Sequence, residues 1–128
     1  MSNINVEKIE NVKIKNLTPH ELVILDENNN VIARIPPSGV VARVQSREEL
    51  IGYINGIPIF KTVYGNIENL PDPEPGVVYA VSIVVLTALK EKGIKRTDVI
   101  SPNTNPSRFG AVRDAQGRII GVKSFIVL

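Results

Sequence analysis

Turn-forming residues interrupt this chain so often that few segments are long enough to form a helix. Asparagine, aspartate, glycine and proline recur every few residues, and each of them either tolerates or imposes a turn geometry of the backbone. The segments between these turns are short and rich in valine and isoleucine, which is typical of strands. The sequence therefore predicts a mainly β (α+β) fold with about nine short strands, arranged as a compact antiparallel sandwich or a small barrel.

Two hairpins are predicted most clearly. Asn55 and Gly56 lie between apolar segments, and both central positions of a two-residue hairpin turn need a positive φ, which these residue types accept. The turn at residues 26–30 should join residues 22–25 to residues 31–35 in the same way.

One helix is expected at about residues 83–92. Ser82 can cap its first turn and Gly93 can end it, while Leu86 and Leu89 would share an apolar face. A single helical turn is also expected at residues 47–50. One helix is too few to cover an open α/β sheet, which favours the β-rich alternative.

The C-terminal end of the chain predicts one more hairpin. Residues 114–117 form a four-residue turn, with Gly117 where a bulged hairpin needs a glycine. Residues 119–128 are apolar at nearly every position, so a central strand buried on both faces is expected there.

The length and composition predict one soluble domain. The chain has 128 residues, which is the usual size of a single domain, and we expect a flexible N-terminus at residues 1–10 followed by one β-rich domain at residues 11–128. The longest apolar run, residues 76–89, is shorter than the ~20 residues that a membrane helix needs. No cysteine is present, which excludes disulfides and thiolate metal sites and fits a cytoplasmic protein.

No catalytic residue, metal ligand or cofactor is predicted. His20 is the only histidine, so a two-histidine metal site is excluded, and we expect Thr18 and His20 to secure a strand-to-turn junction by side-chain hydrogen bonds. A hydrolase would have to use Asp98 or Asp114, although the turn alone accounts for Asp114. Most of the six aromatic residues are expected in the core.

A basic loop near the C-terminus is the one cluster that predicts ligand binding. Residues 95–128 hold six basic and two acidic residues. Guanidinium groups bind phosphate in a bidentate manner, and an exposed aromatic ring beside them could stack on a base. The alternative is a solvated surface patch. The candidate ligand-binding residues are Arg108, Phe109, Arg113, Arg118, Asn103 and Asn105.

Several short motifs occur in a recognisable order. Asn-Leu-Thr-Pro-His stands at residues 16–20, Pro-Pro-Ser-Gly at 36–39, Leu-Pro-Asp-Pro-Glu-Pro-Gly at 70–76 and Val-Arg-Asp at 112–114, followed by Gly-Arg-Ile-Ile-Gly at 117–121. Together they resemble a group of small proteins of bacteriophages and prophages for which no activity is known. The resemblance implies a virus or mobile element as the setting, and it transfers no functional residue.

Three functions remain open on these grounds. The first is a non-enzymatic protein that binds and sequesters a small phosphorylated, nucleotide-like ligand. The second is a structural or assembly protein that acts through homo-oligomer contacts of its extended strands and of a stiff segment containing Pro71, Pro73 and Pro75. The third is a carboxylate-dependent hydrolase. We expect a dimer or larger assembly in each case, and the basic residues are too sparse for a committed duplex-DNA binder.

Overall fold

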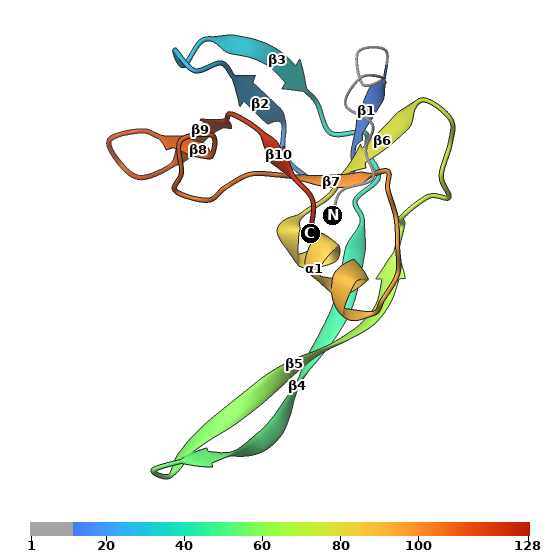
Figure 1. Ribbon diagram of the computed structural model, residues 1–128, viewed down its shortest axis with the longest axis vertical. Coiled ribbons are helices and arrows are strands. Elements are labelled where there is room, and N and C mark those ends of the chain that lie inside the picture. The colour runs from blue at the N-terminus through green and yellow to red at the C-terminus, as the bar shows by residue number, and fades with distance from the viewer. Residues whose placement is uncertain (1–11) are drawn as a thin grey trace.

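A computed structural model describes residues 12–128, and strands dominate it (Figure 1). Ten strands and one helix are found in these residues, which confirms the α+β prediction. The expected flexible segment at residues 1–10 lies outside the described part of the chain.

The strands form two small sheets and one separate ribbon. None of the described sheets closes into a barrel. The first sheet contains, in spatial order, β1 (Lys13–Asn16), β6 (Val77–Ala80), β7 (Val99–Pro102) and β10 (Phe125–Ile126). The second contains β3 (Val31–Ile35), β2 (Leu22–Leu25), β9 (Ile119–Val122) and β8 (Ala111–Arg113). The ribbon consists of β4 (Arg43–Ile54) and β5 (Ile57–Glu68) alone.

Strand direction is mixed, whereas the sequence predicted antiparallel pairing. β1 and β7 both run parallel to β6, and β2 runs parallel to β9. Parallel strands need a long connection, and the helix α1 (Ile83–Glu91) provides one between β6 and β7. The one helix of residues 12–128 is thus also the crossover of a βαβ unit.

The local turn and cap predictions are confirmed. Asn55 and Gly56 have φ values of 51° and 78°, as the two-residue hairpin requires. The Ser82 side chain accepts a hydrogen bond from the Val85 amide at the start of α1, and Gly93 follows the helix with a φ of 68°. β2 and β3 pair as the expected hairpin.

Two expected elements are wrong. Residues 47–50 belong to β4 rather than to a helical turn, because Arg47 pairs with Val63 in the long ladder to β5. Residues 119–128 do not form one strand. They divide into β9, which is central in the second sheet, and β10, which is at the edge of the first sheet, so the apolar run links two sheets.

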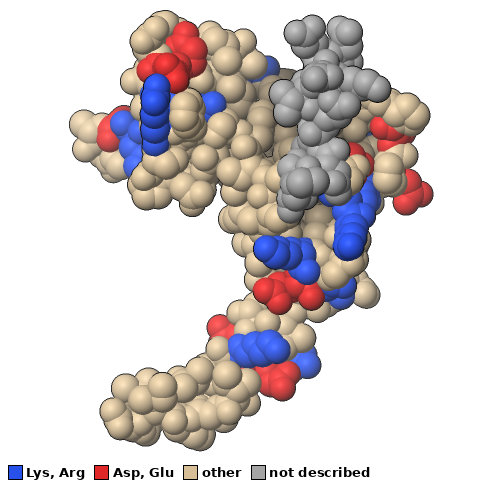
Figure 2. All heavy atoms as spheres, in the orientation of Figure 1, with Lys and Arg blue, Asp and Glu red and all other residues tan. Residues whose placement is uncertain are grey.

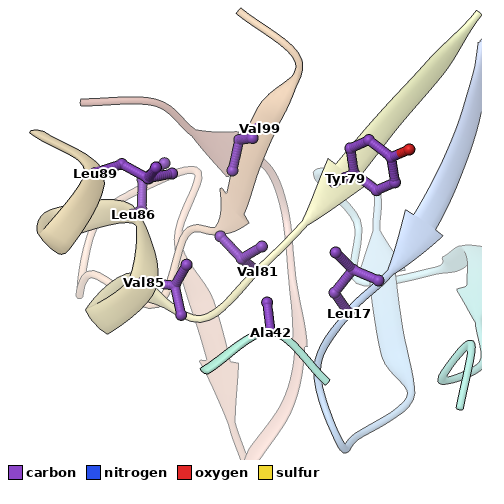
Figure 3. Close-up of a cluster of buried hydrophobic side chains, with 8 residues drawn as sticks. All are labelled: Leu17, Ala42, Tyr79, Val81, Val85, Leu86, Leu89 and Val99. Atoms are coloured by element: carbon purple, nitrogen blue, oxygen red, sulfur yellow. The ribbon is translucent and has the colours of Figure 1, made fainter. Parts of the chain in front are cut away.

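The buried hydrophobic side chains form two clusters, and the one on which the ribbon packs lies where α1 covers the first sheet. Buried side chains from β6, α1, β7 and the segments after β1 and before β4 meet there (Figure 3). They are Leu17, Ala42, Tyr79, Val81, Val85, Leu86, Leu89 and Val99. The base of the β4–β5 ribbon also packs on this core through Val44 and Ile67.

Beyond its base, the β4–β5 ribbon leaves the body of the molecule (Figure 1). We call residues 43–68 the arm and residues 50–60 the arm tip. Each strand of the arm has 12 residues, which at about 3.4 Å per residue extends roughly 40 Å. The arm tip therefore lies far from the rest of the described chain.

Candidate functional site

The C-terminal loop, residues 103–110, is held in place by Asn103. This side chain is buried, and its Nδ2 donates to Ser124 Oγ at 3.1 Å and to the Phe109 carbonyl at 3.4 Å. Its Oδ1 accepts from the Asn105 amide at 3.1 Å. The side-chain polar atoms of Asn103 are thus used in hydrogen bonds that hold the loop, and Asn105 takes part in them through its backbone amide.

Gly110 closes this loop because no side chain fits at that position. A Cβ atom there would lie 1.8 Å from the Asn105 carbonyl oxygen. The same oxygen accepts hydrogen bonds from the amides of Ser107 and Ala111. The loop is therefore a tight, defined structure that presents residues 107–109 outward.

Arg108 and Phe109 form the exposed part of the loop. The Arg108 guanidinium carbon lies 5.1 Å from the centroid of the Phe109 ring, within the range of a cation–π contact. Arg108 also pairs with Glu27 on the β2–β3 turn at 3.2 Å, and both side chains of that pair are mostly exposed.

Arg113 and Arg118 lie on either side of the predicted turn at residues 114–117. Arg113 donates to the Gly117 carbonyl at 2.6 Å, and Arg118 pairs with Asp114 at 3.1 Å. Asp114 also accepts from the amides of Arg118 and Gln116. These hydrogen bonds, that of the Arg118 amide above all, lower the pKa of Asp114 below its ordinary value of 3.8.

All three candidate arginines therefore have partners within the chain. The partners are Glu27, the Gly117 carbonyl and Asp114. The pairs with Glu27 and Asp114 are exposed, and exposed ion pairs contribute only about 0–1 kcal/mol, so an anion of higher charge can displace them. The guanidinium groups are accessible, but Arg113 and Arg118 bind within their own turn, whereas Arg108 binds Glu27 on the β2–β3 turn.

The two aspartates considered for hydrolysis lie in separate ion pairs. Asp98 accepts two hydrogen bonds from Arg96, at 2.8 and 2.9 Å, and this contact with Asp98 raises the pKa of Arg96. Asp114 stabilises its own turn. Within residues 12–128, no three histidine, aspartate or glutamate side chains gather where they could hold a metal ion.

The strand-to-turn junction after β1 is organised by a residue that sequence reasoning missed. Asn16 is 1% exposed. Its Nδ2 donates to the carbonyls of His20 and Ile35, and its Oδ1 accepts from the Thr18 amide and hydroxyl. Thr18 has the expected structural role, whereas the His20 bonds in this network use its backbone. The sequence signal that could have identified Asn16 is its position as a polar residue at the end of a strand with alternating apolar and charged residues.

A groove of about 680 Å³ lies beside this junction. One side comes from β2, β9 and the turn at residues 18–21, and the other from the start of α1 and the end of β7. Ile83, Ile119 and Ile120 line it and are 40%, 43% and 49% exposed. Its lining in residues 12–128 contains one carboxylate, Glu21, which pairs with Arg34 at 2.9 Å.

The arm tip is the most apolar exposed surface of the described chain. Residues 50–60 contain no charged side chain, and Figure 2 shows this end of the molecule without any Lys, Arg, Asp or Glu. Six large apolar side chains are exposed there, namely Leu50, Ile51, Tyr53, Ile54, Ile57 and Phe60. Tyr53 and Phe60 correct the expectation that most aromatic residues would be in the core, which in the described residues holds only Tyr79 as a fully buried ring.

Charged residues begin where the arm tip ends. Arg47, Glu48, Glu49 and Lys61 follow on the part of the arm nearer the body, and Arg47 lies 3.5 Å from Glu49. The arm therefore has a charged part near the body of the molecule and an apolar arm tip. None of the helices in residues 12–128 has the length and apolar character to cross a membrane.

Comparison of the chain with protein-family models, curated proteins and solved structures found no match.

Proposed function

We propose that this protein is a non-enzymatic assembly protein that associates with further copies of itself through the arm. The observation that carries the proposal is the arm tip, which is exposed, free of charge and apolar on both of its faces. Successive residues of a strand point to opposite faces, and Ile51, Tyr53 and Ile57 are more than half exposed, as is Ile54 across the turn from Ile57.

The arm tip is unfavourable in water. Fully burying one large apolar side chain contributes about 1.5–3 kcal/mol. A side chain that is half exposed would therefore contribute roughly 1 kcal/mol more if its exposed half became buried. Six such side chains amount to about 6 kcal/mol per arm. A surface of this kind on a monomer marks an interaction site.

A protein partner explains the arm better than a lipid bilayer does. Both outer edges of a two-stranded ribbon carry unpaired backbone amides and carbonyls, which hydrocarbon cannot satisfy. An isolated two-stranded ribbon is also marginally stable in water. Contact with protein on both faces therefore stabilises the ribbon and leaves its edges hydrated or paired.

A second copy supplies what one arm lacks. Association costs on the order of 4–15 kcal/mol in lost freedom, which the ~6 kcal/mol of one arm barely offsets. In a two-fold symmetric dimer each arm is buried once, so the gain is about twice as large. The proposed function is therefore carried out by a dimer or a larger closed assembly.

The test replaces the apolar end of the arm without unpairing its strands. Ile54 and Ile57 face each other across the turn, so the double variant Ile54→Lys/Ile57→Glu places opposite charges in a favourable cross-strand position. Light scattering at micromolar concentration should give an oligomer for the wild type and a monomer for the variant. The matched control is Ile32→Lys on β3, which is equally exposed at 64% and should remain an oligomer. A monomeric wild type, or an oligomeric arm-tip variant, overturns the proposal.

Capture of a phosphorylated ligand is the second candidate function. The stacked Arg108 and Phe109, presented by a tight loop, favour it because the pair offers a cation and an exposed ring together. Calorimetric titration with nucleotides should give binding that Arg108→Ala weakens at least ten-fold, while Arg47→Ala on the arm leaves it unchanged. Equal binding by wild type and Arg108→Ala would reject this loop as the site.

The cellular setting is part of the same proposal. The motif order at residues 16–20, 36–39, 70–76 and 112–121 resembles phage and prophage proteins, and a cysteine-free chain suits the cytoplasm. An assembly protein of a mobile element would act there. Fractionation of infected cells, with the protein followed in assembled particles and in the soluble fraction, tests this setting.

A further inference from the structure

The arm tip needs a surface that covers both of its faces at once. A flat apolar patch would cover one face and leave the other in water. The groove between the β2–β9 pair and the start of α1 has two sides, and its lining as a whole is mainly apolar. It is thus a receptor of the right kind for a ribbon that is apolar on both faces.

We infer that the arm tip of one copy inserts into this groove of a second copy. This inference rests on the proposed self-association and names its receptor. The groove volume of about 680 Å³ is within the range of sites that hold a small organic molecule, so the groove has room for side chains from the end of the hairpin, such as Ile54 and Ile57.

Charge supports the same occupant. The arm tip has no ionisable group to desolvate. The groove lining in the described chain offers no lysine or arginine, and its ionisable side chains are His20 and Glu21, of which Glu21 is paired with Arg34. An anionic ligand would find no lysine or arginine there, whereas an uncharged apolar segment needs neither.

Geometry requires that the occupant come from another copy. The arm tip and the β2–β9 pair are at opposite ends of the molecule (Figure 1), so an arm cannot fold back into its own groove. If two copies exchange arms about a two-fold axis, each groove receives one arm tip and no apolar end is left over.

The buried area is sufficient for a stable dimer only when the exchange is reciprocal. An aromatic side chain such as Tyr53 or Phe60 presents on the order of 150–250 Å² and an aliphatic one presents less, so six that are roughly half exposed offer at most about 600 Å² on each arm. With a similar area on the groove, one insertion buries roughly 1,200 Å², and two bury about twice as much. Stable specific interfaces bury about 1,200–2,000 Å².

Cysteine cross-linking tests this inference directly, because the natural chain has no cysteine. Ile57→Cys labels the arm tip, Ile120→Cys labels the groove, and Ile32→Cys labels an exposed site outside the groove. Pairs of single variants are mixed, allowed to exchange subunits and treated with a short bis-maleimide. The Ile57→Cys and Ile120→Cys mixture should give at least ten-fold more linked dimer than the Ile57→Cys and Ile32→Cys mixture.

The outcomes separate this inference from the proposed function. A monomeric wild type in light scattering overturns both. An oligomer in which Ile57→Cys links to Ile120→Cys no better than to Ile32→Cys overturns the groove assignment alone. Efficient linking of Ile57→Cys to itself would also overturn the groove assignment, because it would show packing of arm tip against arm tip. As a second measurement, Ile120→Arg should weaken dimer formation at least ten-fold, whereas an unchanged dimer would contradict the groove.

Discussion

Replacement of Asn16 by alanine should cost this protein a large part of its folding free energy. The Asn16 side chain is 1% exposed and makes four hydrogen bonds. The distances are 2.8 Å to the His20 carbonyl, 3.0 Å to the Ile35 carbonyl, 2.9 Å from the Thr18 amide and 2.7 Å from the Thr18 hydroxyl. One side chain thus joins the end of β1 to the end of β3.

The magnitude follows from the partners that the substitution leaves behind. A buried polar group that loses its partner costs about 1–3 kcal/mol. The Thr18 amide is buried with Asn16 and should incur such a cost, whereas the Thr18 hydroxyl can still donate to the His20 carbonyl at 3.1 Å. The His20 and Ile35 carbonyls are part-buried and can bind water at a lower cost. The sum is about 2–4 kcal/mol, out of the 5–15 kcal/mol typical of a domain.

The assay is equilibrium unfolding in urea with linear extrapolation to water. It is best performed in the Ile54→Lys/Ile57→Glu background, because unfolding of a monomer does not depend on protein concentration. Asn28→Ala is the matched control, since Asn28 is an exposed residue of the β2–β3 turn and its replacement should stay within about 0.5 kcal/mol. A loss below about 1 kcal/mol for Asn16→Ala would refute the assignment of this network to stability.

Three further substitutions test the loop, the turn and the buried ion pair. Gly110→Ala, whose Cβ would lie 1.8 Å from the Asn105 carbonyl oxygen, should destabilise the protein by about 2 kcal/mol or more in the same urea assay. The pKa of Asp114 is lowered from 3.8 by the Arg118 amide, so its stabilisation is complete above pH ~4 and is lost as the pH falls through the lowered value. Below pH ~4 the free energy of unfolding should therefore decrease less with falling pH in Asp114→Asn than in the wild type. Arg96→Met leaves the Asp98 carboxylate, 14% exposed, without its partner, and a loss of about 2 kcal/mol is expected by thermal or urea unfolding.

The features predicted from the sequence are those that neighbouring residues decide. The turn at Asn55 and Gly56 needs positive φ at both positions, and the φ values of 51° and 78° follow from the residue types alone. The cap at Ser82 and the helix end at Gly93 are equally local. The turn of Asp114 closes within five residues. Such interactions do not depend on the rest of the fold.

The features that were missed depend on partners distant in sequence. β2 and β9 are parallel neighbours although about 100 residues separate them, and no local pattern encodes that pairing. The apolar segment after Arg118 was expected as one strand, but the part after Val122 joins a different sheet. Arg108 was predicted as a phosphate ligand, which stays a prediction, but its ion pair with Glu27, 81 residues earlier in the chain, was not predicted.

The arm shows why burial cannot be inferred from composition alone. Residues 50–60 have the apolar composition of a core strand, and a sequence pattern cannot distinguish burial within the chain from burial by another molecule. The tight turn at Asn55 pairs β4 with β5 along their whole length, and within residues 12–128 no third strand joins this ribbon. Val44 and Ile67 pack only the base of the arm on the core. Because each strand has twelve residues, Tyr53 lies far from the body of the molecule and remains exposed. The exposed apolar tip therefore follows from the length and pairing of the two strands, which the composition of residues 50–60 does not reveal.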